Sequence, residues 1–251
     1  MMHLTPIVIK VGGNDLEGPD FVAGLARAVA RLEAPAVIVH GGGREISALQ
    51  SQLGLAPRYV DGMRVTDPES LAVAEMVLSG RVNKRLVAAL LKAGVDAIGV
   101  SGVDRGLIRV EKMDHPGGDL GRVGRVVAVR GTVLMEFLEA GVTPVISPIS
   151  LGPDGAYNVN ADHAAGAIAL AIGASAVTFI TNVPGVLVGA QVASSLTAVQ
   201  AEQLIQTGVI HGGMVPKTHA ALQVVAGGVP RAVITDLGGL AGGVGTAFVA
   251  A

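Results

Sequence analysis

Short, nearly continuous apolar runs alternate along the chain with longer segments in which apolar residues recur every three or four positions. The runs Ile7-Val8-Ile9-Lys10-Val11 and Ala36-Val37-Ile38-Val39-His40 are typical of strands that are buried on both faces. Between them, apolar residues at helical spacing predict a helix that is capped by Asp20 and reaches Leu32. The chain therefore opens as strand, helix, strand, which is typical of a parallel α/β sheet.

The same two patterns continue toward the carboxyl terminus. Further strands are predicted at 96–101, 107–110, 123–129, 143–147, 176–181, 232–235 and 247–249. Further helices are predicted at about 44–53, 69–78, 82–91, 133–140, 164–172 and 197–206, and another enters near Pro216 and ends near Ala226. The glycine-rich segment 238–245 is predicted to be a flexible loop. The length of 251 residues fits one large α/β domain, or two small lobes that share a sheet.

Two glycine turns follow the first two predicted strands, Gly12-Gly13 and Gly41-Gly42-Gly43. Glycine lets backbone N–H groups approach an anion, and a helix that starts behind the turn adds a partial positive charge. One such turn is explained by a tight strand-to-helix connection. Two turns, one of them preceded by Lys10, favour a phosphate or carboxylate site. Lys10 would be costly to bury without a partner, unless it lies at an edge with its head in water.

A central polar stretch reads Tyr157-Asn158-Val159-Asn160-Ala161-Asp162. In extended backbone, Asn158, Asn160 and Asp162 would face the same side and form a surface of two amides and a carboxylate. The alternative is a polar turn in which Asp162 caps the next helix. Elsewhere, Arg64 lies in a short predicted loop, either as a two-pronged donor to an anion or as a solvated surface residue.

Composition excludes several classes of protein. The net charge of −2 and the 2% of aromatic residues argue against a nucleic-acid partner. The chain has no cysteine, so disulfides, thiolate metal sites and cysteine nucleophiles are excluded. It has no apolar run long enough to cross a membrane and no signal peptide pattern, so we expect a cytoplasmic protein. His115 is expected to be an exposed loop histidine, and no metal site is predicted.

Together the candidate residues suit phosphoryl transfer. That reaction needs cations and oriented N–H groups around the transferred group, rather than a nucleophile with an adjacent base. Lys10 and Lys217 are the candidate cations, and Asp162 is placed to hold both ammonium groups. Mg²⁺ would normally accompany the nucleotide. The chain contains neither a G-x-x-x-x-G-K-[ST] phosphate loop nor an H-R-D catalytic loop, so it belongs to neither common class.

The motifs of this chain, in order, resemble those of the amino acid kinase family. The resemblance extends from the first strand to about residue 236 and is closest to the members that act on N-acetyl-L-glutamate. It rests on Lys10-Val11-Gly12-Gly13, His40-Gly41-Gly42-Gly43, Arg64-Val65-Thr66-Asp67, Asn158-Val159-Asn160-Ala161-Asp162, Asn182-Val183-Pro184-Gly185-Val186 and Gly213-Met214-Val215-Pro216-Lys217.

The resemblance implies a fold and a reaction. The fold is an open, mainly parallel sheet sandwiched between helices, with an acceptor lobe at about 1–175 and a nucleotide lobe at about 176–251. The reaction is transfer of phosphate from ATP, with Mg²⁺, to the γ-carboxylate of N-acetyl-L-glutamate in arginine biosynthesis. The implied catalytic residues are Lys10, Lys217 and Asp162. The implied acceptor residues are Gly42, Gly43, Arg64, Asn158 and Asn160, and the implied nucleotide residues are Gly12, Gly13, Thr181, Asn182, Val183, Gly185 and Gly212.

The chain departs from the family pattern in several places. Asn182 stands where an aspartate is usual, the segment 187–196 is short and lacks the usual acidic residue, and the end after Asp236 is short and rich in glycine. The chain also starts close to its first strand, without the helical extension of the arginine-inhibited hexamers. The resemblance therefore implies a homodimer that is insensitive to arginine.

Two alternatives remain open at this stage. A sister kinase of lysine biosynthesis would use the same residues on a carrier-linked α-aminoadipate or glutamate. A regulatory member of the fold would be non-catalytic, and loss of Lys10, Lys217 or Asp162 would mark it, yet all three are present. A dinucleotide-binding oxidoreductase is excluded because neither early glycine turn reads G-x-G-x-x-G.

Overall fold

The computed structural model of the protein describes residues 5–12 and 16–250. Within these ranges the chain forms an 11-stranded sheet in which β13-β15-β14-β10-β1-β2-β8-β6-β7 follow one another, and β5 and β9 also pair with β8. The strands are β1 (Ile7–Val11), β2 (Ala36–His40), β5 (Ala97–Gly102), β6 (Ile108–Lys112), β7 (Gly124–Val129), β8 (Thr143–Gly152), β9 (Gly155–Asn158), β10 (Ala176–Ile180), β13 (Ser195–Leu196), β14 (Arg231–Thr235) and β15 (Thr246–Val249).

Most neighbouring strands of this sheet run parallel. The parallel pairs include β1 with β2 and β10, β10 with β14, and β8 with β2, β5 and β6. Within the described part of this sheet, antiparallel pairing is confined to β14–β15, β6–β7 and β8–β9. Two small hairpins lie outside the sheet: β3 (Tyr59–Val60) with β4 (Met63–Arg64), and β11 (Leu187–Val188) with β12 (Gln191–Val192).

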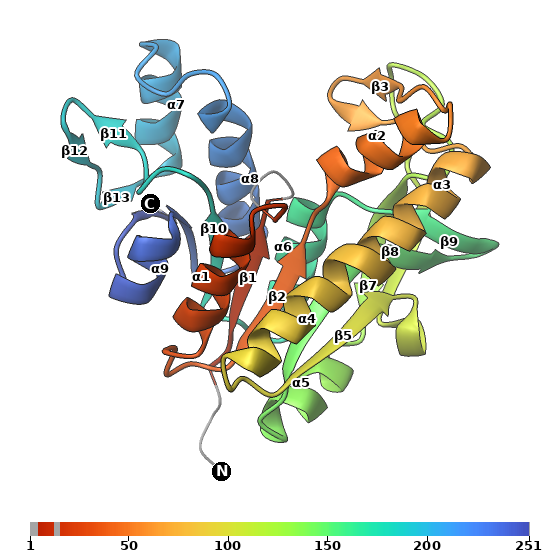
Figure 1. The fold of residues 1–251 in the computed structure, drawn as a ribbon. Helices are drawn as coiled ribbons and strands as arrows, with labels where there is room; N and C mark the ends of the chain where they lie inside the picture. The colour runs from red at the N-terminus through yellow and green to blue at the C-terminus, as the bar shows by residue number, and fades with distance from the viewer. Residues whose placement is uncertain (1–4, 13–15, 251) are drawn as a thin grey trace.

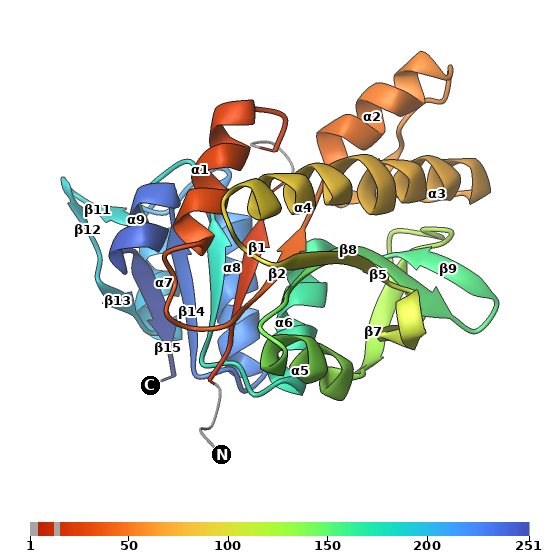
Figure 2. The ribbon, with the colours of Figure 1, turned by 60° about the horizontal axis from the view of Figure 1, so that its bottom comes forward.

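Helices cover both faces of the sheet, as Figures 1 and 2 show. Their bounds are α1 (Pro19–Val29), α2 (Gly43–Gln52), α3 (Pro68–Glu75), η1 (Met76–Val82), α4 (Asn83–Lys92), η2 (Asp104–Gly106), α5 (Gly131–Glu139), α6 (Ala161–Ala171), α7 (Ala198–Gln206), α8 (Met214–Ala226) and α9 (Leu237–Gly242). The predicted class, an open and mainly parallel sheet sandwiched between helices, is confirmed. None of the helices in the described ranges is both long and apolar enough to pass through a membrane.

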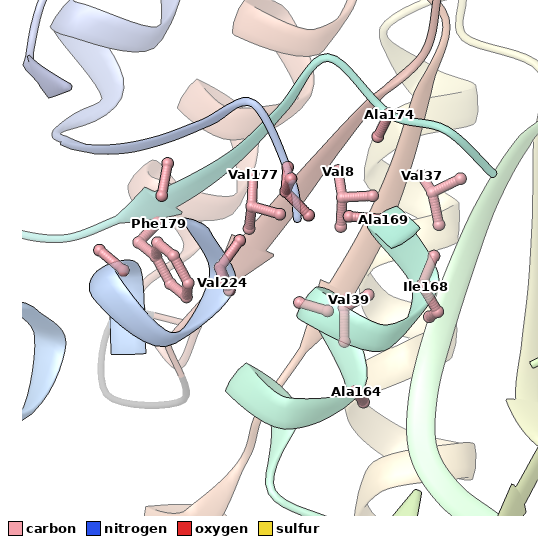
Figure 3. Close-up of a cluster of buried hydrophobic side chains, with 14 of the residues drawn as sticks. Val8, Val37, Val39, Ala164, Ile168, Ala169, Ala174, Val177, Phe179 and Val224 are labelled. Atoms are coloured by element: carbon pink, nitrogen blue, oxygen red, sulfur yellow. The ribbon is translucent and has the colours of Figure 1, made fainter. Parts of the chain in front are cut away.

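Two apolar cores hold these layers together, and successive strand residues point into one or the other. Val8 packs with α5, α6 and α8 on one face, whereas its neighbour Ile9 packs with α1, α4 and α9 on the other. Figure 3 shows part of the first core, where Val8 and Val39 lie beside α6 with its Ala164 and Ala169, and Phe179 lies beside Val224 of α8. This alternation explains why the central strands are apolar throughout: each side chain is covered by a helix.

The structure corrects several predictions about local elements. Asp20 lies in the first turn of α1 rather than at its cap, and α1 ends at Val29, before Leu32. The segment 238–245, predicted as a loop, contains most of α9, because Asp236 caps that helix through the N–H of Gly239 and Leu240 is buried in the core. The two helices predicted at 69–78 and 82–91 are joined by η1, a π-helical turn.

The carboxyl ends of the central strands meet at one edge of the sheet. Val11 is level with His40 of β2 and with Ile180 of β10 in the strand register. The turns that follow β1, β2 and β10 therefore begin side by side. From the neighbouring strands β1 and β10 the chain leaves in opposite directions along the sheet, toward β2 after β1 and toward β13 after β10. Parallel sheets characteristically bind ligands at such a switch point.

Candidate functional site

A cavity of about 760 Å³ opens at this edge, between the ends of the strands, α2 and the β3–β4 hairpin. Figure 1 shows α2 and the hairpin standing beyond the end of β2. The cavity brings together two of the three predicted catalytic residues and all the predicted acceptor residues: Lys10, Gly42, Gly43, Arg64, Asn158, Asn160 and Asp162.

Lys10 and Asp162 form an ion pair in the cavity, with 2.7 Å between Nζ and Oδ1. Lys10 lies on the same face of β1 as Val8, and this face packs against α6, whose first turn carries Asp162. The side chains retain 17% and 28% of their exposure, so the pair is largely covered but still reachable from the cavity. The alternative of a lysine at an edge is wrong, because β1 lies between β2 and β10.

The residues of the central polar stretch, 157–162, have different structural roles. Asn160, not Asp162, caps α6: its Oδ1 accepts a hydrogen bond of 2.7 Å from the N–H of Asp162. The Nδ2 of Asn158 donates to Oγ1 of Thr66 over 3.2 Å, which ties the stretch to the segment that carries Arg64. The cap therefore fixes the direction in which the Asp162 carboxylate leaves the helix.

Arg64 is a half-buried cation whose described partners are all neutral. Its Nη1 donates to Oε1 of Gln50 over 2.5 Å, and its Nη2 donates to the Gly43 carbonyl and the Ser47 hydroxyl over 2.8 and 2.7 Å. The ring centroid of Tyr59 lies 4.9 Å from the guanidinium carbon. Burial lowers the pKa of Arg64 below its usual value. Among the described residues no carboxylate forms an ion pair with it, so its charge is uncompensated in the cavity.

Gly42 and Gly43 are glycines for different reasons. A Cβ on Gly42 would lie 2.7 Å from Cδ2 of Leu78, so α2 can approach η1 closely only without a side chain there. A Cβ on Gly43 would meet only Nη2 of Arg64, at 4.0 Å, and one on Gly12 would meet nothing within 4 Å. Gly43 lines the cavity and leaves space there, so that a backbone N–H group can be approached by an anion. Gly13 lies outside the described residues.

His40 lies fully buried beneath the second glycine turn. Its Nδ1 is 3.1 Å from the Gly41 carbonyl, and its Nε2 is 3.2 Å from Nδ2 of Asn83. The neutral tautomer with hydrogen on Nδ1 satisfies both contacts, since it donates to the carbonyl and accepts from the amide. Burial lowers the pKa of His40 to about 4. His40 is therefore a neutral support of the turn.

Apart from Gly12 and Gly13, the predicted nucleotide residues lie on turns at the end of β10 and before α8. Thr181 is buried, and its Oγ1 accepts from the N–H of Val183 over 3.0 Å, while Asn182 is exposed. Gly185 has a φ of +150°, and a Cβ there would lie 2.6 Å from Oγ1 of Thr246, so packing alone requires glycine. Gly212 also has a positive φ, of +55°.

Lys217 is not brought to the ion pair of Lys10. It lies in the first turn of α8, and its Nζ donates to the Gly213 carbonyl over 3.4 Å. Asp162 therefore pairs with one of the two predicted lysines in this structure. Lys217 shares its helix with residues packed against α6, whose first turn carries Asp162, so the two elements are neighbours.

Three side chains of the site were not predicted from the sequence: Ser47, Gln50 and Tyr59. Gly43, Ser47 and Gln50 stand at positions i, i+4 and i+7 of α2, which is one face of a helix. A polar face on a helix that directly follows a glycine turn is the sequence signal that could have identified Ser47 and Gln50. Tyr59 had no comparable signal, because its contact with Arg64 depends on the hairpin.

No described group of three histidine, aspartate or glutamate side chains could hold a metal ion. His115 is not the exposed loop residue that the sequence predicts: its side chain is 14% exposed, and Nε2 lies 3.7 Å from Oδ2 of Asp61. The loop therefore folds back against the β3–β4 hairpin.

The chain is similar to several known proteins. The model of the amino acid kinase family matches residues 5–236. The acetylglutamate kinase of Roseiflexus sp. (strain RS-1) is 61% identical over 234 residues, covering 93% of this chain and 90% of that protein. The acetylglutamate kinase of Chloroflexus aurantiacus (strain ATCC 29366 / DSM 635 / J-10-fl) is 49% identical over 243 residues, covering 96% and 95%. The crystal structure of smu.665 from Streptococcus mutans UA159 has a TM-score of 0.80 and 31% identity, covering 98% and 99%.

Proposed function

This chain belongs to the amino acid kinase family, and on that premise we propose that it transfers the γ-phosphate of ATP to the side-chain carboxylate of N-acetyl-L-glutamate, in arginine biosynthesis. The relatives that support this substrate are named acetylglutamate kinases and match nearly the whole chain. The observation that carries the proposal is one cavity that holds both an uncompensated guanidinium and a lysine paired with an aspartate.

The acceptor has two carboxylates, and the cavity offers a different partner for each. Arg64 binds the α-carboxylate, since a guanidinium matches a planar anion and no carboxylate of the described residues forms an ion pair with this one. Asn158 and Asn160 line the same wall and offer amide groups to the acylated amine. The side-chain carboxylate then lies toward Lys10, with the N–H groups of Gly42 and Gly43 beside it.

The reaction needs no general base. The side-chain carboxylate of the acceptor has an ordinary pKa of about 4.3, so it is already a nucleophile at neutral pH. One of its oxygens attacks the γ-phosphorus, the bond from phosphorus to the bridging oxygen breaks, and ADP leaves with that electron pair. Lys10 and Lys217 stabilise the charge on the transferred group and the leaving oxygen. Asp162 holds Lys10 in place rather than accepting a proton.

The nucleotide is assigned to the turns after β1 and β10 and to the start of α8. Backbone N–H groups of Gly12, Gly13 and Gly212 serve the phosphates, and Thr181, Asn182, Val183 and Gly185 serve the nucleoside side. Mg²⁺ would be carried by the phosphates of ATP, because the described chain offers no cluster of carboxylates to hold it. In this assignment the acceptor lobe spans about 1–175 and the nucleotide lobe about 176–251. The proposal includes a cytoplasmic homodimer, which rests on the family resemblance.

The test is formation of an acyl phosphate, trapped with hydroxylamine as a hydroxamate. N-acetyl-L-glutamate would be compared with free glutamate, free α-aminoadipate and a carrier-linked acceptor, each with ATP and Mg²⁺. We expect turnover on N-acetyl-L-glutamate alone. Turnover only on the carrier-linked acceptor would reject the proposed substrate and leave the reaction type standing, whereas no turnover on any acceptor would reject the kinase itself.

Lys217→Ala provides the second arm of this experiment. Since Lys217 is assigned to the transition state, we expect kcat to fall by about 100- to 1,000-fold, with little change in the KM for the acceptor. Lys92→Ala is the matched control, because Lys92 ends α4 and does not line the cavity. An unchanged kcat would remove Lys217 from the mechanism.

A further inference from the structure

Arg64 is held in the cavity wall by a chain of buried polar contacts, and this chain points to a residue with a specific role. We propose that Gln50 is a positioning residue, which presents Arg64 to the α-carboxylate of the acceptor and so makes the enzyme select acceptors that carry this group. The inference rests on the proposed function and goes beyond it by naming the residue that controls the selectivity.

Gln50 itself has little freedom to move. Its side chain is fully buried on α2, and its Nε2 donates to the Ser70 hydroxyl over 2.8 Å. Ser70 is fixed in turn, because its backbone N–H donates to Oδ1 of Asp67, the cap of α3, over 2.8 Å. The hydrogen bond to Ser70 thus fixes the orientation of the Gln50 amide, and the amide oxygen accepts a hydrogen bond from Nη1 of Arg64.

The neutrality of Gln50 is the important chemical feature. A carboxamide oxygen orients the guanidinium but leaves its charge available to a ligand, whereas a carboxylate of the same shape would form an ion pair with it. Ser47 and the Gly43 carbonyl, which hold Nη2, are neutral as well. The three contacts use three N–H groups of the guanidinium, and its five N–H groups leave two for the acceptor. These neutral partners therefore fix the orientation of the Arg64 guanidinium and do not compensate its positive charge.

The test compares Gln50→Glu and Gln50→Leu with the wild type on two acceptors. One acceptor is N-acetyl-L-glutamate, and the other is its α-amide, which keeps the reacting side-chain carboxylate but lacks the group that Arg64 binds. With Gln50→Glu we expect the KM for N-acetyl-L-glutamate to rise at least tenfold, because the new carboxylate competes for Arg64. The KM for the α-amide, the KM for ATP and kcat should each change less than twofold.

Gln52→Glu is the matched control, since it makes the same substitution on the same helix at an exposed position. It should leave every constant unchanged. An equal rise in KM for both acceptors would show that Gln50 only supports the fold, and that result would overturn the inference. So would an unchanged KM for N-acetyl-L-glutamate in Gln50→Glu.

A spectroscopic measurement separates this inference from the proposed function. In ¹⁵N NMR spectra without ligand, the guanidinium signals of Arg64, assigned by their loss in Arg64→Lys, should show slow rotation in the wild type. They should merge through faster rotation in Gln50→Leu. If the wild type turned over neither acceptor, the proposed function would fail, and the spectra would still decide whether Gln50 holds Arg64. Identical Arg64 signals in both proteins would overturn that role.

Discussion

The proposed acceptor side and the proposed nucleotide side of the molecule are built in different ways. On the acceptor side, Lys10, Arg64 and Asn158 each have a side-chain partner before any ligand is present. On the nucleotide side, the assigned groups are mostly backbone turns, and Lys217 contacts only the Gly213 carbonyl among the described residues. If the proposed assignment is right, the acceptor side is the more preorganised of the two.

The difference follows from where each group sits in the fold. Lys10 is on a central strand, and Asp162 is in the first turn of a helix that is packed on that strand. Their separation is thus fixed by the core. Gly212 and Lys217 instead lie at the exposed start of α8, outside the sheet. Preorganised charges cost no reorganisation during the reaction, so the acceptor side should be the less tolerant of substitution.

The largest effect is expected for Asp162→Asn. This change removes the charge that holds Lys10 but keeps the shape of the side chain, so Lys10 is free to turn away from the transferred group. We expect kcat to fall by about 100- to 1,000-fold, with a small change in the KM for N-acetyl-L-glutamate, as measured by steady-state kinetics. His163→Ala, at the next and exposed position of α6, is the control. A kcat within threefold of the wild type would mean that the acceptor side is not preorganised through this pair.

Much of the fold could be predicted because its information is local. The apolar runs at 7–11 and 36–40 identify central strands, since such strands are buried on both faces. The capping box at Thr197 identifies the start of α7 for a similar reason, as its hydrogen bonds span only three residues. The motifs likewise identify the residues that line the cavity, because strand ends in a parallel sheet meet at one edge.

The remaining features depend on contacts between distant parts of the chain. Gln50 meets Arg64 and Ser70 only once the hairpin and α3 are in place, so its role is invisible in the sequence around it. The helix α9 forms from glycine-rich residues whose helical propensity is low, and it does so because Leu240 is buried beside α1.

A second prediction concerns the pH dependence of stability. It tests the acceptor side only, because His40 supports the glycine turn on that side. Its pKa is about 4 in the folded protein against 6.5 as the ordinary value, so the unfolded chain binds a proton that the folded protein excludes. The stability contributed by neutral His40 is therefore complete above about pH 6.5, is lost as the pH falls toward 4 and is constant below that. The expected loss is about 3 kcal/mol in the free energy of unfolding.

Urea denaturation between pH 7 and 4, in the wild type and in His40→Gln, measures this term. The variant lacks the titrating group, so its stability should fall less steeply over the same interval, whatever the carboxylates contribute to both proteins. If the free energy of unfolding fell equally with pH in the two proteins, His40 would not be the source of the acid sensitivity. The same substitution at exposed His211 should leave the pH dependence as in the wild type.

The smallest effects are expected at the adjacent glycines Gly42 and Gly43. Substitutions at these two positions distinguish a packing role from a binding role on the acceptor side. Gly42→Ala forces a Cβ against Leu78, so we expect a loss of about 1 kcal/mol in stability by thermal unfolding. Gly43→Ala has room and places a good helix former at the start of α2, so its stability should be unchanged or slightly higher. Its methyl group faces the cavity beside Arg64, however, and the KM for the acceptor should rise severalfold. If Gly43→Ala instead destabilised the protein and left KM unchanged, both glycines would serve packing, and the binding role would rest on Arg64 and Asn158.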